Sequence, residues 1–97
     1  MGFDPSKPLR AADAKRYLRQ ILEEGFVDFT QHALDERASD VMTTVDAVNV
    51  LRAGVIREPE WENGAWRYRS ETQKYCVVFE LESEEECLVV TAWRFNR

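Results

Sequence analysis

Histidine and cysteine are scarce in this chain: His32 is the only histidine, and Cys76 and Cys87 are the only cysteines. Two cysteines make no disulfide framework, and with a single histidine they give no metal-ligand spacing. We therefore expect no metal site and no cofactor. No apolar run approaches the roughly 20 residues that a bilayer-spanning helix needs, and the charged start of the chain leads into no apolar segment. These absences favour a cytoplasmic protein that has no membrane partner.

Sequence signatures of nucleophilic catalysis and of phosphate-binding loops are also missing. No serine or cysteine elbow accompanies a histidine with an orienting acid, and the four glycines are dispersed along the chain. Neither cysteine lies at a predicted helix start or beside an evident cation, so we expect no activated thiolate. Covalent catalysis and phosphate binding through a glycine-rich loop are both disfavoured.

Apolar and aromatic residues are plentiful: 44% of the 97 residues are hydrophobic, and they include three Trp, five Phe and three Tyr. A chain of this length forms one modest core and is too short for two. We expect a single domain over residues 1–97, with flexible tails at residues 1–6 and 96–97. The formal net charge is -5, whereas proteins that grip phosphate groups usually carry the opposite balance.

The first predicted helix lies within PSKPLRAADAKRYLRQILEEG. Ser6 is suited to the N-cap, Pro8 to the first turn, and Gly25 follows the last turn. Apolar residues recur along this segment at helical spacing and predict the face that packs inward. These residues are Ala11, Ala14, Leu18, Ile21 and Leu22.

A short apolar segment and a second helix follow. We interpret Phe26–Phe29 as an edge strand, because it is brief and extended in character. Thr30 is the expected N-cap of a helix over Gln31–Ala38. The side chains expected to point inward from this helix are Ala33, Leu34 and Val41.

The stretch TTVDAVNVLRAG predicts a third helix. Thr43 or Thr44 is its N-cap, Asp46 favours the positive end of the helix dipole, and Gly54 ends it. The apolar spacing predicts an inner stripe of Val45, Val48 and Leu51.

After the third helix the apolar pattern alternates, and β-branched and aromatic residues dominate, which predicts antiparallel strands. The four expected strands are Val55–Trp61, Ala65–Ser70, Lys74–Leu81 and Cys87–Phe95. Three helices followed by a meander of four to five strands predict an α+β fold. In such a fold the helices cover one face of a single antiparallel sheet.

Asn63 and Gly64 predict a two-residue hairpin turn, because both positions tolerate a positive φ. This turn fixes the register of the two flanking strands and leaves one face aromatic, while the other carries ion pairs. The expected cross-strand pairs are Glu62 with Ala65, Trp61 with Trp66, Glu60 with Arg67, Pro59 with Tyr68 and Glu58 with Arg69.

An acidic loop at Glu82–Glu85 predicts the second hairpin. The expected pairs are Phe79 with Leu88, Val77 with Val90, Cys76 with Thr91 and Tyr75 with Ala92. This register separates Cys76 from Cys87 by four residues along the ladder, roughly 13 Å. Because disulfides require Cα atoms within about 7 Å, we expect two free thiols.

His32 opens the second predicted helix in FTQHALDER. Its side chain is the only one here whose unperturbed pKa lies near neutrality, which makes it the natural general acid or base of an enzyme. The alternative is a helix-start histidine whose ring bonds to nearby backbone. On its own spacing, the residue fits this structural role better.

Three arginines are candidates for phosphate contacts. Alternation points Arg67 and Arg69 to the same strand face, where they could hold two phosphates. The alternative is structural pairing with Glu60 and Glu58, and such pairs contribute about 0.2–1 kcal/mol each. Arg94, near the end of the last strand, either reaches a cleft formed with the helices or is a solvated strand end.

Tyr68 and Tyr75 could donate a hydroxyl group or stack on nucleic-acid bases. Aromatic residues that alternate in a strand more often belong to a core, however. We expect that role for Tyr68 and also for Trp61, Trp66 and Trp93.

Four motifs follow one another in an order that resembles a known family. They are FTQHAL, VNVLRAG, WRYR and CLVVTAWR, and they lie between Val27 and Arg94, over most of the chain. None of them is diagnostic by itself. Their order and spacing resemble those of small bacterial domains related to MqsR-like and BrnT-like proteins in the RelE/ParE toxin superfamily.

The resemblance implies a RelE-like fold and the toxin of a toxin–antitoxin pair, a metal-independent mRNA endoribonuclease that an antitoxin protein neutralises. In such an enzyme a ribose 2′-hydroxyl attacks the adjacent phosphate, while a base takes its proton and cations stabilise the phosphorane. The residues implied in catalysis are His32, Arg67, Arg94, Tyr68 and Tyr75. Those implied in RNA binding are Arg69 and Arg37.

Two other functions remain open. A non-catalytic module of the same fold would bind a protein partner through an acidic surface or an exposed sheet edge. A self-associating domain would use exposed tryptophans or the sheet edge to form a homodimer. The order of motifs favours the toxin, whereas the acidic charge disfavours RNA binding and favours the binding module.

Overall fold

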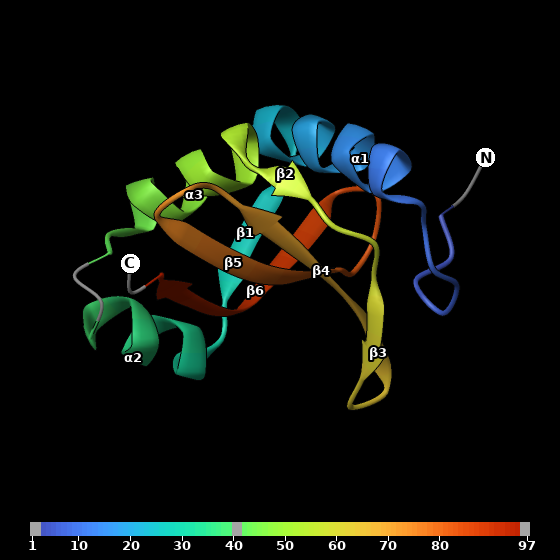
Figure 1. Ribbon diagram of the computed structural model, residues 1–97. Helices are drawn as coiled ribbons and strands as arrows, with labels where there is room; N and C mark the ends of the chain where they lie inside the picture. Colours follow the sequence, from blue (N-terminus) through green and yellow to red (C-terminus); the bar gives the residue numbers. More distant parts are fainter. Residues whose placement is uncertain (1–2, 40–41, 96–97) are drawn as a thin grey trace.

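The computed structural model describes residues 3–39 and 42–95, and of residues 36–39 only the backbone (Figure 1). Helices dominate the first half of the chain and strands the second half, so the predicted α+β class is confirmed. The elements are α1 (Ala11–Glu24), β1 (Phe26–Phe29), α2 (Gln31–Ser39), α3 (Thr44–Ala53), β2 (Val55–Ile56), β3 (Glu60–Glu62), β4 (Ala65–Glu71), β5 (Tyr75–Leu81) and β6 (Glu86–Arg94).

The strands form one mixed sheet in the order β1-β6-β5-β4-β2, and β3 pairs with β4 beyond the end of β2. The sheet has more strands than expected because the predicted strand Val55–Trp61 divides into β2 and β3, which pair with successive parts of β4. The edge strand β1 joins β6 in parallel, whereas the other pairings are antiparallel.

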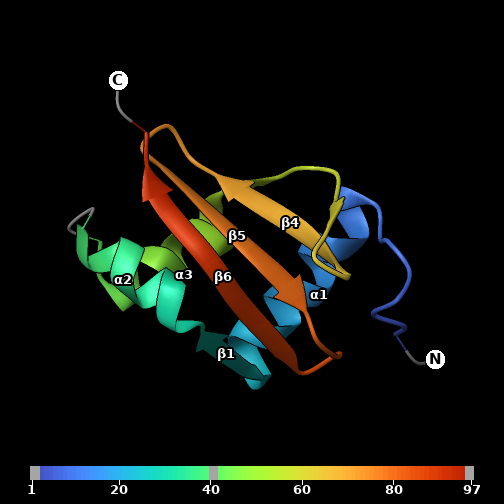
Figure 2. The same ribbon diagram turned by 90° about the horizontal axis from the view of Figure 1, so that it is seen from below.

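Two of the helices cover one face of the sheet. In Figure 1, α1 and α3 lie together above the strands, and Figure 2 shows no helix in front of β4, β5 and β6 on the opposite face. We call this second face the open face. α2 lies beside β6 where β1 ends, and Thr30 ties it there: its N–H donates to Val89 O and its hydroxyl to Val90 O.

The core lies between the two helices and the sheet. Tyr68 and Phe79 stack with ring centroids 5.5 Å apart, and both are buried. The largest apolar side chains that meet them are Leu18, Ile21, Leu51, Val77 and Val89. Burial of such side chains contributes about 1.5–3 kcal/mol each and is the main source of stability here.

The first helix begins at Ala11, so the expected start at Ser6 is wrong. Ser6 instead donates from both its N–H and its hydroxyl to the Asp4 carboxylate, at 2.9 and 2.7 Å, and forms a turn. The free N–H groups before and at the helix start find distant acceptors: Leu9 donates to the Tyr68 hydroxyl and Ala11 to the Glu58 carboxylate. A cap supplied from so far along the chain leaves no local sequence signal.

The predicted caps of the other helices are confirmed. The Thr30 hydroxyl accepts from the N–H of Ala33, and Thr43 forms a reciprocal capping box with Asp46. The predicted inner stripe of α3 is wrong, because its buried residues are Ala47, Val50 and Leu51, whereas Val45 is 67% exposed. Leu51 belongs to both the predicted and the observed set. The observed set occupies positions i, i+3 and i+4 counted from Ala47. The expected inward residue Val41 lies outside the described residues.

The first hairpin has the predicted turn, with φ of 50° at Asn63 and 82° at Gly64. The three pairs nearest the turn are confirmed: Glu62 with Ala65, Trp61 with Trp66 and Glu60 with Arg67. The pair of Glu58 with Arg69 is wrong, since one extra residue lies between β3 and β2. Arg57 therefore donates its N–H to Arg69 O, and the Glu58 side chain turns towards α1.

The predicted register of the second hairpin is wrong. Glu82 N–H donates to Glu86 O and closes a shorter loop, which sets Leu81 opposite Cys87. A bulge beside Phe79 then shifts the rest of the ladder. The observed pairs there are Val78 with Thr91, Val77 with Ala92, Cys76 with Trp93 and Tyr75 with Arg94. The two cysteines are free, as expected.

The structure describes residues 3–6 of the predicted N-terminal tail. Residues 1, 2, 96 and 97, which belong to the predicted tails, lie outside the described residues. Phe3 packs on Tyr17 with ring centroids 5.3 Å apart, and Ser6 O accepts from the indole N–H of Trp66 at 3.1 Å. This N-terminal segment therefore covers one end of the helical layer.

The last turn of α3 is a junction between both layers. Lys15 of α1 donates from Nζ to three carbonyl oxygens there: Leu51 O at 3.3 Å, Arg52 O at 2.8 Å and Gly54 O at 3.0 Å. The buried Ser70 hydroxyl of β4 donates to Val50 O at 2.7 Å. The bonds from Lys15 to Leu51 O and Arg52 O satisfy carbonyl groups that a helix C-terminus leaves open, whereas Val50 O also accepts from the N–H of Gly54.

Replacing Lys15 with Met should lower the free energy of unfolding by about 1.5–3 kcal/mol, because hydrogen bonds from a charged group to the end of α3 are lost. Urea denaturation measures this change. The matched control is Arg16→Met, since the exposed Arg16 contacts only neighbours on its own helix among the described residues, pairing with Asp13 and lying over the ring of Tyr17. Equal losses of unfolding free energy in the two variants would show that the bonds from Lys15 to the end of α3 contribute nothing specific to stability.

Candidate functional site

The open face holds the two arginines of the WRYR motif, which alternation places on the same side of β4. Arg67 is held between two carboxylates, with Nη1 3.3 Å from Glu62 and Nε 3.0 Å from Glu80. Arg69 lies over the ring of Trp93, with Cζ 5.7 Å from the ring centroid. Both guanidinium groups are thus already engaged by side chains of the same sheet.

Tyr68 faces the opposite way from Arg67, since adjacent residues of a strand point to opposite faces. Its ring is buried under α1, and its hydroxyl accepts from the N–H of Leu9 at 2.9 Å. Burial raises the pKa of this hydroxyl, while the hydrogen bond from Leu9 opposes that shift. Tyr68 therefore has the core role that we expected of alternating aromatics.

Tyr75 and Arg94 lie at the other end of the sheet, where they form a cross-strand pair. Tyr68 pairs with Phe79, so Tyr75 is four residues farther along β5, roughly 13 Å at the usual rise. The structure thus brings Tyr75 and Arg94 together, and Arg67 with Arg69, but separates these two pairs.

The remaining candidates belong to α2. His32 is exposed in the first turn of this helix, two residues after the Thr30 cap. The side chain of Arg37 lies outside the described residues. The seven residues implied by the resemblance therefore come from both faces and both ends of the sheet and from α2, rather than from one cleft.

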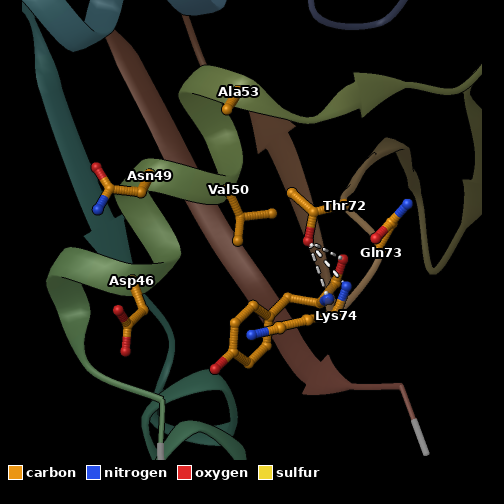
Figure 3. A pocket seen from close by; sticks show the side chains of 8 residues that line it. Asp46, Asn49, Val50, Ala53, Thr72, Gln73 and Lys74 are labelled. Carbon is orange, nitrogen blue, oxygen red and sulfur yellow. Dashed lines mark hydrogen bonds between the residues drawn. The ribbon is translucent and has the colours of Figure 1, made fainter. Parts of the chain in front are cut away.

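A pocket of about 440 Å³ lies between α3 and the turn that joins β4 to β5. Figure 3 shows Thr72, Gln73 and Lys74 of the turn across from α3. The α3 residues that line it are Asp46, Asn49, Val50 and Ala53. Two of its polar groups have internal partners, because Asp46 accepts from Thr43 N–H and Asn49 accepts from Arg52. These two polar side chains of α3 therefore form hydrogen bonds within their own helix and its cap.

Carboxylates gather at the end of the molecule where α1 and the β5–β6 loop meet. Gly25 sits so close to Glu85 that a Cβ there would clash with Glu85 O, and the N–H of Phe26 donates to the same oxygen at 2.8 Å. We call this region the acidic end. Its carboxylates are Glu23, Glu24, Glu82, Glu84, Glu85 and Glu86.

No cation of the described residues forms an ion pair with the carboxylates of the acidic end. The last turn of α1 has no basic residue, so Glu23 and Glu24 lie at the negative end of the helix dipole, where acidic side chains are unfavourable. This end of the protein therefore carries an excess of negative charge. The sequence signal for it is the run ESEEE, which by its local pattern predicts only a turn.

The two cysteines are suited to packing and not to reaction. Burial, with a smaller contribution from the carboxylate of Glu71 at Cys76 and of Glu82 at Cys87, raises the pKa of each thiol to about 12. The Cys76 thiol also approaches the Glu71 carboxylate at 4.0 Å. Since the thiolate is the reactive form, neither group is a nucleophile near neutral pH.

Among the side chains of residues 3–35 and 42–95, no group of three or more His, Cys, Asp or Glu is placed to hold a metal ion. None of the helices in that part of the chain is long and apolar enough to cross a membrane.

Comparisons of the chain with models of known protein families, with curated proteins and with solved structures find no match.

The thiols predict a pH dependence of stability. Each has a pKa of about 12 in the folded protein, against 9.0 for an ordinary thiol. The folded state keeps protons that the unfolded state loses in this range, so the free energy of unfolding should fall as the pH rises from 9.0 towards 12. Urea denaturation along a pH series measures it.

The double variant Cys76→Ala, Cys87→Ala is the control for this series. Its stability should fall less steeply over the same pH range, because Tyr68 is then the only described group whose pKa is raised. Identical slopes for the variant and the original chain would show that the thiols are not the cause.

Proposed function

We propose that the protein is a non-catalytic binding module that holds a basic protein partner at the acidic end. The observation that carries this proposal is the gathering of six carboxylates without a cation from the described residues beside them. Potentials of one sign steer oppositely charged partners and raise the rate of association. The net charge of -5 favours the same class of partner.

The backbone around the acidic end suits it to this role. The close contact of Gly25 with Glu85 joins α1 to the β5–β6 loop, so the carboxylates project from firmly packed elements. Phe26, directly beside this contact, is 67% exposed. It begins β1, which forms the edge of the sheet and pairs with β6 alone. An apolar side chain and a strand edge thus border the acidic surface.

A second candidate is the RelE/MqsR-like endoribonuclease, acting as a toxin that an antitoxin neutralises. In its favour, Arg67 and Arg69 lie on the same face of β4, and Arg69 lies over the ring of Trp93. A cation beside an aromatic ring suits RNA. Against it, Glu62 and Glu80 already neutralise Arg67. Of the other candidates, Tyr68 is buried on the opposite face, and Tyr75 and Arg94 pair at the far end of β5 and β6.

A lysine- and arginine-rich peptide labelled with a fluorophore should bind the purified chain, and the affinity should fall as salt increases. The double variant Glu85→Gln, Glu86→Gln should bind about fivefold more weakly, as expected for the loss of two exposed charges. Fluorescence anisotropy measures both. The same peptide without its label should also compete with a natural partner for binding to the chain.

The matched control is Asp35→Asn, Glu60→Gln, which removes the same number of exposed charges outside the acidic end. Equal weakening in both double variants would mean that net charge alone attracts the peptide. Cleavage of RNA by the purified chain, lost on Arg67→Ala or Arg69→Ala, would overturn the binding module and establish the second candidate.

A further inference from the structure

A second concave surface adjoins the acidic end. It is a groove of about 280 Å³ between the β3–β4 hairpin, the N-terminal segment and the start of the β5–β6 loop. We call it the tryptophan groove. The residues that matter below are Pro5, Ser6, Trp61, Trp66, Glu80 and Glu82.

The walls of the tryptophan groove are aromatic and held in place. Trp61 and Trp66 are cross-strand partners, with ring centroids 5.2 Å apart in an edge-to-face arrangement. The indole N–H of Trp66 donates to Ser6 O at 3.1 Å and fixes that ring against the N-terminal segment. Trp61 is 55% exposed, so its expected core role is wrong. It is exposed because the hairpin projects from the body of the protein (Figure 1).

The charge in the tryptophan groove is negative. Glu80 lines it but shares its carboxylate with Arg67, at 3.0 Å. Glu82 is exposed, and its carboxylate accepts no hydrogen bond from the described residues. No lysine or arginine is among the residues that line the groove. An exposed indole face beside an unpaired carboxylate attracts a cation.

We propose that the tryptophan groove binds an arginine side chain of the basic partner, with the guanidinium over the Trp61 ring and paired to the Glu82 carboxylate. The inference rests on the proposed function and names the residue type that the partner contributes. Arginine fits better than lysine because its planar guanidinium stacks on an aromatic ring and can bond to a carboxylate through two N–H groups at once.

The test is a titration of the full chain with N-acetyl-arginine amide, followed by NMR. The indole N–H signals of Trp61 and Trp66 should shift, whereas that of Trp93, which lies on the open face, should not. N-acetyl-citrulline amide has a nearly identical shape without the charge and should cause no shift. N-acetyl-lysine amide should bind more weakly than the arginine compound.

Two variants localise the binding. Trp61→Ala and Glu82→Gln should each weaken the arginine compound about two- to fivefold. Glu60→Gln is the matched control, since it removes an exposed carboxylate from the strand of Trp61 that does not line the groove, and it should leave the affinity unchanged. The citrulline comparison uses the unaltered chain, so it tests whether binding needs the guanidinium charge even if a variant folds poorly.

The outcomes separate this inference from the proposed function. Equal shifts with arginine and citrulline, or shifts at Trp93 alone, would overturn the arginine site. If the basic peptide still binds the acidic end in that case, the proposed function stands without the groove. If neither the peptide nor the arginine compound binds, both proposals fail.

Discussion

The last turn of α3 is the constraint on which the arrangement of the layers depends. Lys15 from α1 and Ser70 from β4 both donate to its carbonyl groups, so one helix end joins the neighbouring helix and the sheet. Gly54 makes this possible, because a Cβ there would clash with Ser70 Oγ and lie 2.6 Å from Val50 O. Burial also lowers the pKa of Lys15, the cost of placing a cation between packed elements.

This junction sets the position of both surfaces to which we assign a function. β4 runs from Ser70 at the junction to Trp66 in the projecting hairpin, and α1 runs past Lys15 to the carboxylates at its C-terminus. The acidic end and the tryptophan groove are therefore carried by elements held at a common point. Sites on packed helices and strands keep their geometry better than sites on free loops. The open face, in contrast, satisfies its arginines internally.

Local patterns predicted the α+β class, the Thr30 and Thr43 caps and the Asn63-Gly64 turn, since each depends on residues close together in the chain. The predictions were wrong where the local structure depends on groups that are distant in the sequence. The start of α1 depends on Tyr68 and Glu58, and the second hairpin depends on a bulge that alternation cannot show. For the site, only the neighbouring positions of Arg67 and Arg69 followed from the sequence. The acidic end needs α1 and the β5–β6 loop to meet, which no local pattern indicates.

The central claim is that the protein acts through its acidic end and not through the open face. Backbone chemical-shift mapping with the lysine- and arginine-rich peptide tests it most directly, because every described element reports separately. Our account expects shifts in the last turn of α1, the β5–β6 loop and the β3–β4 hairpin, and none at Arg69 or Thr91 of the open face. Shifts centred on β4, β5 and β6 at the open face, with the acidic end unchanged, would contradict it.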